Sequence, residues 1–123
     1  MDSLREKFIG VRATTMNLVD ELRAEDTVVQ SMPDVSPTKW HLAHVTWFFE
    51  RFVLEPCGVP RLDDEYHFLF NSYYNSVGEM HPRPQRGMIT RPTCDEVLTY
   101  RAHVDEHSFR LAGSALAGRM GVV

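Results

Sequence analysis

The sequence predicts an all-α fold in which three helices, one proline-containing connector and one long loop form a single domain over residues 1–123. Apolar residues recur at helical spacing in three separate segments, and capping signals precede the second and third of these segments. Apolar residues make up 43% of the chain and charged residues 24%, which is typical of one globular domain with a real core.

The first helix is expected to begin at Leu4 and to end near residues 24–27. Its apolar stripe recurs at intervals of three and four residues and consists of Leu4, Phe8, Val11, Thr15, Leu18 and Leu22. Charged residues occupy the other faces, so we expect this helix to pack by one face only. Residues 30–35, which include Pro33, form a connector to the second helix.

The second helix is expected to begin at Ser36 and Pro37, because serine is a favourable N-cap and a proline in the first turn needs no N–H donor. The segment Trp40–Leu54 is apolar on nearly every face, which predicts a position in the middle of the bundle. Pro56 and Gly58 are expected to end this helix.

A long loop is predicted to join the second and third helices. Residues 57–92 show neither the helical nor the strand period, and they contain four of the seven prolines. Loops of this length are usually functional or disordered, and aromatic residues argue against disorder. The aromatic residues are Tyr66, Phe68, Phe70, Tyr73 and Tyr74. We therefore expect an ordered, packed loop.

The third helix is predicted to begin at Thr93, because Thr93 and Glu96 match a capping box. Its apolar residues recur at helical spacing as far as Leu111, and the pattern weakens after Arg110, where three glycines follow. Three helices with an apolar central member leave one face uncovered. We therefore expect a fourth helix or a partner to cover that face.

The composition argues against several classes of partner and compartment. A formal charge of −4 provides no basic surface for phosphate backbones or anionic lipids, so neither nucleic acid nor a membrane is expected as a partner. Cys57 and Cys94 lack the spacing of a zinc site or a disulfide framework, and no signal-peptide segment is present, so we expect a cytoplasmic protein. Nucleotide-binding glycine motifs and the GxSxG nucleophile motif are also absent.

Histidines are the first candidates for chemistry, because imidazole binds transition metals and exchanges protons near neutral pH. His44 shares its helical face with Trp40 and Trp47 and is predicted to point toward the bundle interior. It is either a functional group or a core histidine that is hydrogen-bonded to a carbonyl. His103 and His107 have the i, i+4 spacing of a metal-binding pair, but their place beside the apolar stripe favours an exposed surface pair.

The long loop also contains a pair of arginines. Arg83 and Arg86 lie three residues apart among prolines, and a guanidinium binds a carboxylate through a planar fork of donors. Prolines stiffen the backbone and so reduce the entropy that is lost when such a fork is ordered. The pair is either a carboxylate-binding site or two solvated loop arginines.

Several segments, in the same order, resemble the N-terminal DinB-like domain of the iron-dependent sulfoxide synthases of ergothioneine biosynthesis. These segments are Ser36–Glu50, Leu69–Tyr74, His81–Gly87 and Arg91–Thr93. The resemblance extends over residues 28–111. It implies an up-down bundle of four helices, of which three are present here. In the family a C-terminal domain of the formylglycine-generating-enzyme type follows, and three histidines bind a non-haem iron.

The resemblance also implies roles for three residues. His44 matches the first iron ligand, and Arg83 and Arg86 match a pair that binds a carboxylate of the thiol substrate, cysteine or γ-glutamylcysteine. The family's reaction joins the thiol sulfur to the imidazole ring of hercynine with O₂ and gives a sulfoxide. The other two iron ligands belong to an HxxxHxE motif, which the 123 residues lack. The chain alone is therefore expected to be inactive and not to retain iron(II).

Two further interpretations are consistent with the sequence. In the first, the chain is a non-catalytic helical module that forms a homodimer, or docks a missing C-terminal domain, through the uncovered apolar face. In the second, the chain is a stand-alone DinB-like metalloprotein that binds a metal ion through His44, His103 and His107.

Overall fold

The computed structural model describes residues 2–72 and 78–112, and this part of the chain is helical and contains no strand. The α-helices are α1 (Asp2–Val19), α2 (Thr38–Phe49), α3 (Glu65–Leu69) and α4 (Cys94–Ala112). A π-helical turn, Glu50–Leu54, continues α2. The 3-10 helices are η1 (Ala24–Val28), η3 (Glu55–Cys57) and η5 (Arg83–Met88). The predicted all-α fold class is confirmed.

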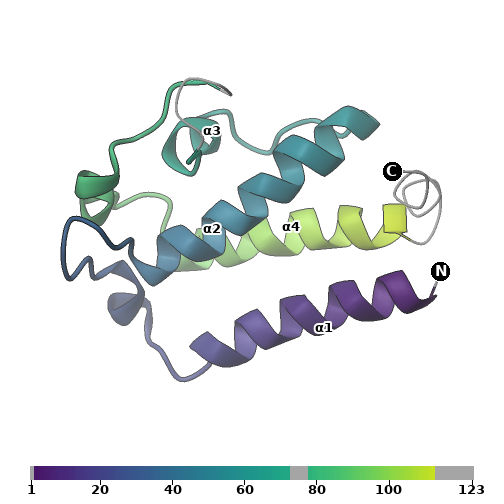
Figure 1. Cartoon of the computed structure of the whole chain (residues 1–123), viewed down its shortest axis with the longest axis horizontal. Helices are drawn as coiled ribbons and strands as arrows, with labels where there is room; N and C mark the ends of the chain where they lie inside the picture. Colours follow the sequence, from purple (N-terminus) through teal and green to yellow (C-terminus); the bar gives the residue numbers. More distant parts are fainter. Residues whose placement is uncertain (1, 73–77, 113–123) are drawn as a thin grey trace.

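The three long helices lie side by side, with α4 between α1 and α2 in the view of Figure 1. Helix α1 runs antiparallel to α4, because Arg5 contacts Phe109 and Arg12 pairs with Asp105. The up-down alternation expected of the bundle thus holds between the first helix and the two others.

Helices α2 and α4, in contrast, run in the same direction (Figure 1). Trp40 and Val97, near the starts of the two helices, share one core cluster, and Leu54 and Val104, further along, share the other. The long segment between the helices returns the chain to the end at which α2 begins. It can therefore place its own side chains over the start of α2.

The core consists of two neighbouring clusters of buried side chains. The first is Trp40, Leu42, Ala43, Trp47, Phe70, Ile89 and Val97, and the second is Leu54, Tyr100 and Val104. Tyr66 packs against both clusters. Burial of these apolar side chains is the main source of stability, at about 25 cal/mol per Å² of apolar surface removed from water.

The buried face of α1 differs from the predicted stripe. Val11 and Leu18 are 66% and 79% exposed, whereas Arg12 is buried and Phe8 and Val19 are partly buried beside it. The physical reason is a polar contact: the Arg12 guanidinium lies 2.7 Å from an Asp105 carboxylate oxygen and 3.3 Å from the Thr46 hydroxyl. This pairing orients the helix, and apolar spacing alone did not reveal it.

Two predicted boundaries also shift. Helix α1 ends at Val19, and the chain continues through the separate 3-10 helix η1 instead of one helix to residues 24–27. Helix α2 begins one residue later than expected, with Pro37 at the N-cap, because the Ser36 hydroxyl accepts a hydrogen bond from Arg86 and does not cap the helix.

The long loop is ordered and packed in its described part, as predicted, and contains α3 and η5. Tyr73 and Tyr74 lie outside the described residues. The capping box of α4 is confirmed, because the Thr93 N–H donates to the Glu96 carboxylate at 2.9 Å and the Glu96 N–H donates to the Thr93 hydroxyl at 3.2 Å.

Within residues 2–72 and 78–112, none of the helices combines the length and the apolar character that crossing a membrane requires.

Candidate functional site

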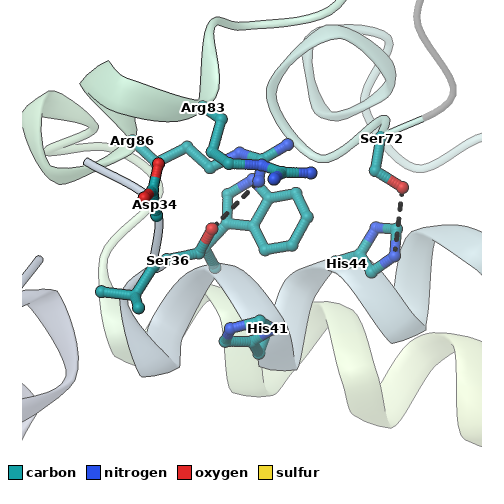
Figure 2. A pocket seen from close by; sticks show the side chains of 9 residues that line it. Asp34, Ser36, His41, His44, Ser72, Arg83 and Arg86 are labelled. Atoms are coloured by element: carbon teal, nitrogen blue, oxygen red, sulfur yellow. Dashed lines mark hydrogen bonds between the residues drawn. The ribbon is translucent and has the colours of Figure 1, made fainter. Parts of the chain in front are cut away.

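A cavity of about 450 Å³ opens where the start of α2, the connector before it and η5 meet (Figure 2). Its lining residues are Asp34, Val35, Ser36, Trp40, His41, His44, Ser72, Arg83 and Arg86. The structure therefore brings the three residues to which the resemblance assigns roles, His44, Arg83 and Arg86, to the wall of the same cavity.

The imidazole of His44 is held in one tautomer. Its Nδ1–H donates to the Phe70 carbonyl oxygen at 2.8 Å, so Nε2 keeps its lone pair and lies 3.5 Å from the Ser72 hydroxyl (Figure 2). The ring stacks between Trp40, at a centroid distance of 4.5 Å, and Trp47, at 5.6 Å. The bond at Nδ1 is the one expected of a core histidine, but Nε2 remains on the cavity side.

Burial lowers the pKa of His44 below its usual value, the positive charge of Arg86 and the proximity of His41 lower it further, and the Phe70 carbonyl offsets part of this shift. Burial and Arg86 also lower the pKa of His41. Both imidazoles are therefore neutral at pH 7. A neutral imidazole with a fixed Nδ1–H can accept a proton or bind a metal ion at Nε2.

The two arginines reach the cavity from η5 (Figure 2). Arg86 is only 3% exposed; its guanidinium carbon lies 3.6 Å from the centroid of the Trp40 ring, and Nη1 donates to the Ser36 hydroxyl at 2.9 Å. Arg83 is exposed at the mouth of the cavity. Asp34 lines the same cavity, and it forms no ion pair with either arginine in the described part of the chain. Two guanidiniums against one carboxylate favour an anionic ligand.

Helix α3 supports the cavity through its last carbonyl groups. The Trp40 indole N–H donates to the Leu69 carbonyl at 2.9 Å, and the next residue, Phe70, accepts the bond from His44. A short helix therefore orients two of the side chains that line the cavity. Sequence reasoning placed aromatic residues in this loop but had no signal for these carbonyl contacts.

A buried polar network holds α3 in place. The fully buried carboxylate of Glu50 accepts hydrogen bonds from the Tyr100 hydroxyl at 2.7 Å, the Leu62 N–H at 3.0 Å and His67 Nε2 at 3.2 Å. The Trp47 indole N–H donates to His67 Nδ1. Burial alone would raise the pKa of Glu50, but these hydrogen bonds outweigh burial and lower it. The network connects α2 and its π-helical continuation with α3 and α4.

A family model that describes the DinB superfamily matches residues 7–121 of this chain. The chain belongs to the DinB superfamily. No curated protein sequence matches this DinB protein. The family assignment agrees with the helical architecture, and it carries no reaction with it, so the chemistry of the cavity has to be argued from its residues.

His103 and His107 of the DinB domain are not part of the cavity. They are partly buried on α4, and their rings contact each other edge to face at a centroid distance of 4.6 Å. Among residues 2–72 and 78–112, no three His, Cys, Asp or Glu side chains are grouped closely enough to bind one metal ion. His44, His103 and His107 therefore form no such group in the described part of the chain, and His44 lines the cavity without the other two.

The surroundings of His44 fit the role of one ligand of a metal ion. Metal-binding histidines usually donate their second ring N–H to a carbonyl or carboxylate, and the His44–Phe70 bond has this form. His44 is also neutral and directs Nε2 toward a cavity with polar walls. A complete site needs further ligands, because one imidazole alone binds iron(II) weakly.

Proposed function

We propose that this DinB domain serves an iron(II)-dependent sulfoxide synthase of the ergothioneine type, in which it supplies one iron ligand and the carboxylate-binding wall of the thiol pocket. The observation that carries the proposal is the meeting of His44 Nε2 and the arginine pair Arg83 and Arg86 in one cavity. Residues that are about 40 positions apart in the sequence thereby line one cavity, where they would offer a nitrogen ligand for a metal ion and two guanidinium groups for a carboxylate.

The arginine pair is assigned to a carboxylate of a cysteine-type thiol, either cysteine or γ-glutamylcysteine. Arg86 is already ordered by Trp40 and Ser36, so binding of a carboxylate loses little side-chain entropy at this position. Arg83 is exposed and would close over the ligand from the cavity mouth. A thiol acid bound in this way has its carboxylate at η5 and its sulfur directed to the His44 side.

His44 is assigned to iron(II) through Nε2. The Phe70 carbonyl and the stacked rings of Trp40 and Trp47 fix its tautomer and orientation. When bound, iron(II) would supply O₂ activation for joining the thiol sulfur to the imidazole of hercynine. The family's remaining ligands, its HxxxHxE motif and its C-terminal domain would complete the site, and the chain alone is expected to be inactive.

The carboxylate assignment can be tested on the 123-residue chain. NMR shift titration of the ¹⁵N-labelled chain with γ-glutamylcysteine is expected to move resonances of the cavity residues, and Arg83→Lys and Arg86→Lys should each weaken binding about tenfold, because lysine keeps the charge and loses the planar fork. Arg91→Ala, which changes an exposed arginine outside the cavity lining, is the matched control. Unchanged affinity in both lysine variants would contradict the assignment.

The iron assignment is tested in the sulfoxide synthase that contains this domain. His44→Ala is expected to lose iron(II), whereas Arg83→Ala and Arg86→Ala should raise KM for the thiol and leave the iron content unchanged. Metal analysis and steady-state kinetics separate the two effects. Full iron occupancy in His44→Ala would exclude this residue as a ligand.

One observation favours a second function, assembly through an apolar face. Val45, Phe48 and Phe52 form an exposed row at spacings of three and four residues along α2 and the π-helical turn that continues it, on the side opposite the buried face. A homodimer or the C-terminal domain would cover this row. Sedimentation equilibrium is expected to show a dimer that Phe48→Glu dissociates if the chain pairs with itself, and a monomer at all concentrations if it does not.

A further inference from the structure

The side chain of Gln30 clamps the arginine-bearing segment η5 to the connector. Its Nε2 donates to the Val35 carbonyl at 2.8 Å and to the Arg83 carbonyl at 2.9 Å, and its Oε1 accepts the Gly87 N–H at 2.6 Å. The amide can adopt only this orientation, because the opposite one would direct its N–H donors at the Gly87 N–H and its oxygen at two carbonyls.

The clamp depends on the close approach of two backbone segments that are 57 residues apart in the sequence. A Cβ atom at Gly87 would lie 2.9 Å from both Cβ and Oε1 of Gln30, so only glycine leaves room for the amide. A larger residue at position 87 would displace Gln30 and loosen η5 from the connector.

The three hydrogen bonds act on the residues that hold the arginine pair. The carbonyl of Arg83 and the N–H of Gly87 lie near the two ends of η5, so the amide holds both ends of the segment that carries both guanidiniums. The third bond, to the Val35 carbonyl, lies next to Ser36, and the Ser36 hydroxyl accepts a hydrogen bond from Arg86 Nη1. Gln30 thus fixes the backbone at η5, and Ser36 fixes the tip of one arginine.

We infer that Gln30 is a positioning residue that sets the separation and direction of Arg83 and Arg86, and that it thereby determines the affinity of the cavity for a ligand carboxylate. The inference rests on the carboxylate site of the proposed function. Gln30 itself does not line the cavity. Its effect therefore passes through the backbone of η5, and it should be specific for ligands that have a carboxylate.

The test compares γ-glutamylcysteine with cysteamine, which has the thiol and lacks a carboxylate, in NMR shift titrations of the labelled chain. Gln30→Ala and Gln30→Glu are expected to weaken γ-glutamylcysteine binding about tenfold and to leave cysteamine binding unchanged. Gln30→Glu keeps the shape of the side chain and removes both donors. The matched control is Gln85→Ala, which changes an exposed glutamine of the same segment whose side chain makes no hydrogen bond within the described residues.

A ligand-independent measurement accompanies the titrations. Hydrogen exchange of the Gly87 amide should become at least about tenfold faster in Gln30→Ala, because its acceptor is removed, and should stay at the wild-type rate in Gln85→Ala. Gly87→Ala should reproduce the loss of γ-glutamylcysteine affinity, and the double variant with Gln30→Ala should be no weaker than either single variant.

The outcomes separate the inference from the proposed function. If the Arg83 and Arg86 variants lose affinity and Gln30→Ala binds γ-glutamylcysteine like the wild type, the positioning role is wrong and the carboxylate site stands. If the arginine variants bind γ-glutamylcysteine as well as the wild type does, or the wild type does not bind it, the carboxylate site and the positioning role are both wrong. Equal weakening of cysteamine and γ-glutamylcysteine would show general destabilisation and would also overturn the positioning role.

Discussion

The cavity side of the molecule and the outward side of α1 differ in what their side chains contact. Around the cavity, Trp40, His44 and Arg86 each combine a ring contact with a directed hydrogen bond. On the outward side of α1, Val11 and Leu18 follow a regular apolar spacing and are largely exposed. Apolar periodicity therefore locates a helix, whereas polar pairing decides which of its faces is buried.

Among the predictions, Trp47→Ala should have the largest effect on stability. It tests whether the cavity side of the molecule is packed and the outward side of α1 is not. Trp47 is fully buried in the first core cluster, so Trp47→Ala is expected to lower the free energy of unfolding by about 3–5 kcal/mol. Leu18→Ala on the outward side is the control and should change it by less than about 0.5 kcal/mol. Urea unfolding measures both, and a comparable loss in Leu18→Ala would show that the outward face is covered in solution.

The Glu50 network should come next in size. Because the pKa of Glu50 is lowered on folding, its contribution to stability is complete above its ordinary value of 4.5 and is lost as the pH falls through the lower, folded value. Glu50→Gln is expected to cost about 1–3 kcal/mol at pH 7 and to flatten the acid dependence of stability. Urea unfolding between about pH 3 and pH 7 measures the free energy of unfolding and its acid dependence in both proteins. Glu6→Gln, on the exposed side of α1, is the control, and an unchanged acid dependence in Glu50→Gln would contradict the network.

The smallest effect concerns the protonation of His44. Its pKa is lowered on folding, so the unfolded chain gains this proton first as the pH falls below 6.5, and stability decreases from there down to the folded value. NMR titration of the His44 ring should give a midpoint below 6.5, and Arg86→Ala should raise that midpoint by removing a positive charge and by admitting water. A midpoint at or above 6.5 in the wild type would place this ring in solvent instead of the cavity wall.

The positions of the long helices could largely be predicted from the sequence, whereas the residues that form the cavity could be predicted only in part. The capping box at Thr93 and Glu96 and the packed loop were predicted and are confirmed. The three candidates on the cavity wall were singled out by residue type and by family resemblance, and their roles stay predictions. Gln30 carried no sequence signal, since an amide in a polar connector looks like any solvated side chain.

Local patterns in the sequence located the three long helices, because capping and apolar spacing depend on residues within a few positions of one another. Three other features became visible only in the folded chain: the buried face of α1, the shared direction of α2 and α4, and the contact of Gln30 with Gly87. These features depend on contacts between residues at least 34 positions apart, such as Arg12 with Thr46 and Gln30 with Gly87. Such contacts follow from the packing of whole elements, and no local pattern in the chain encodes them.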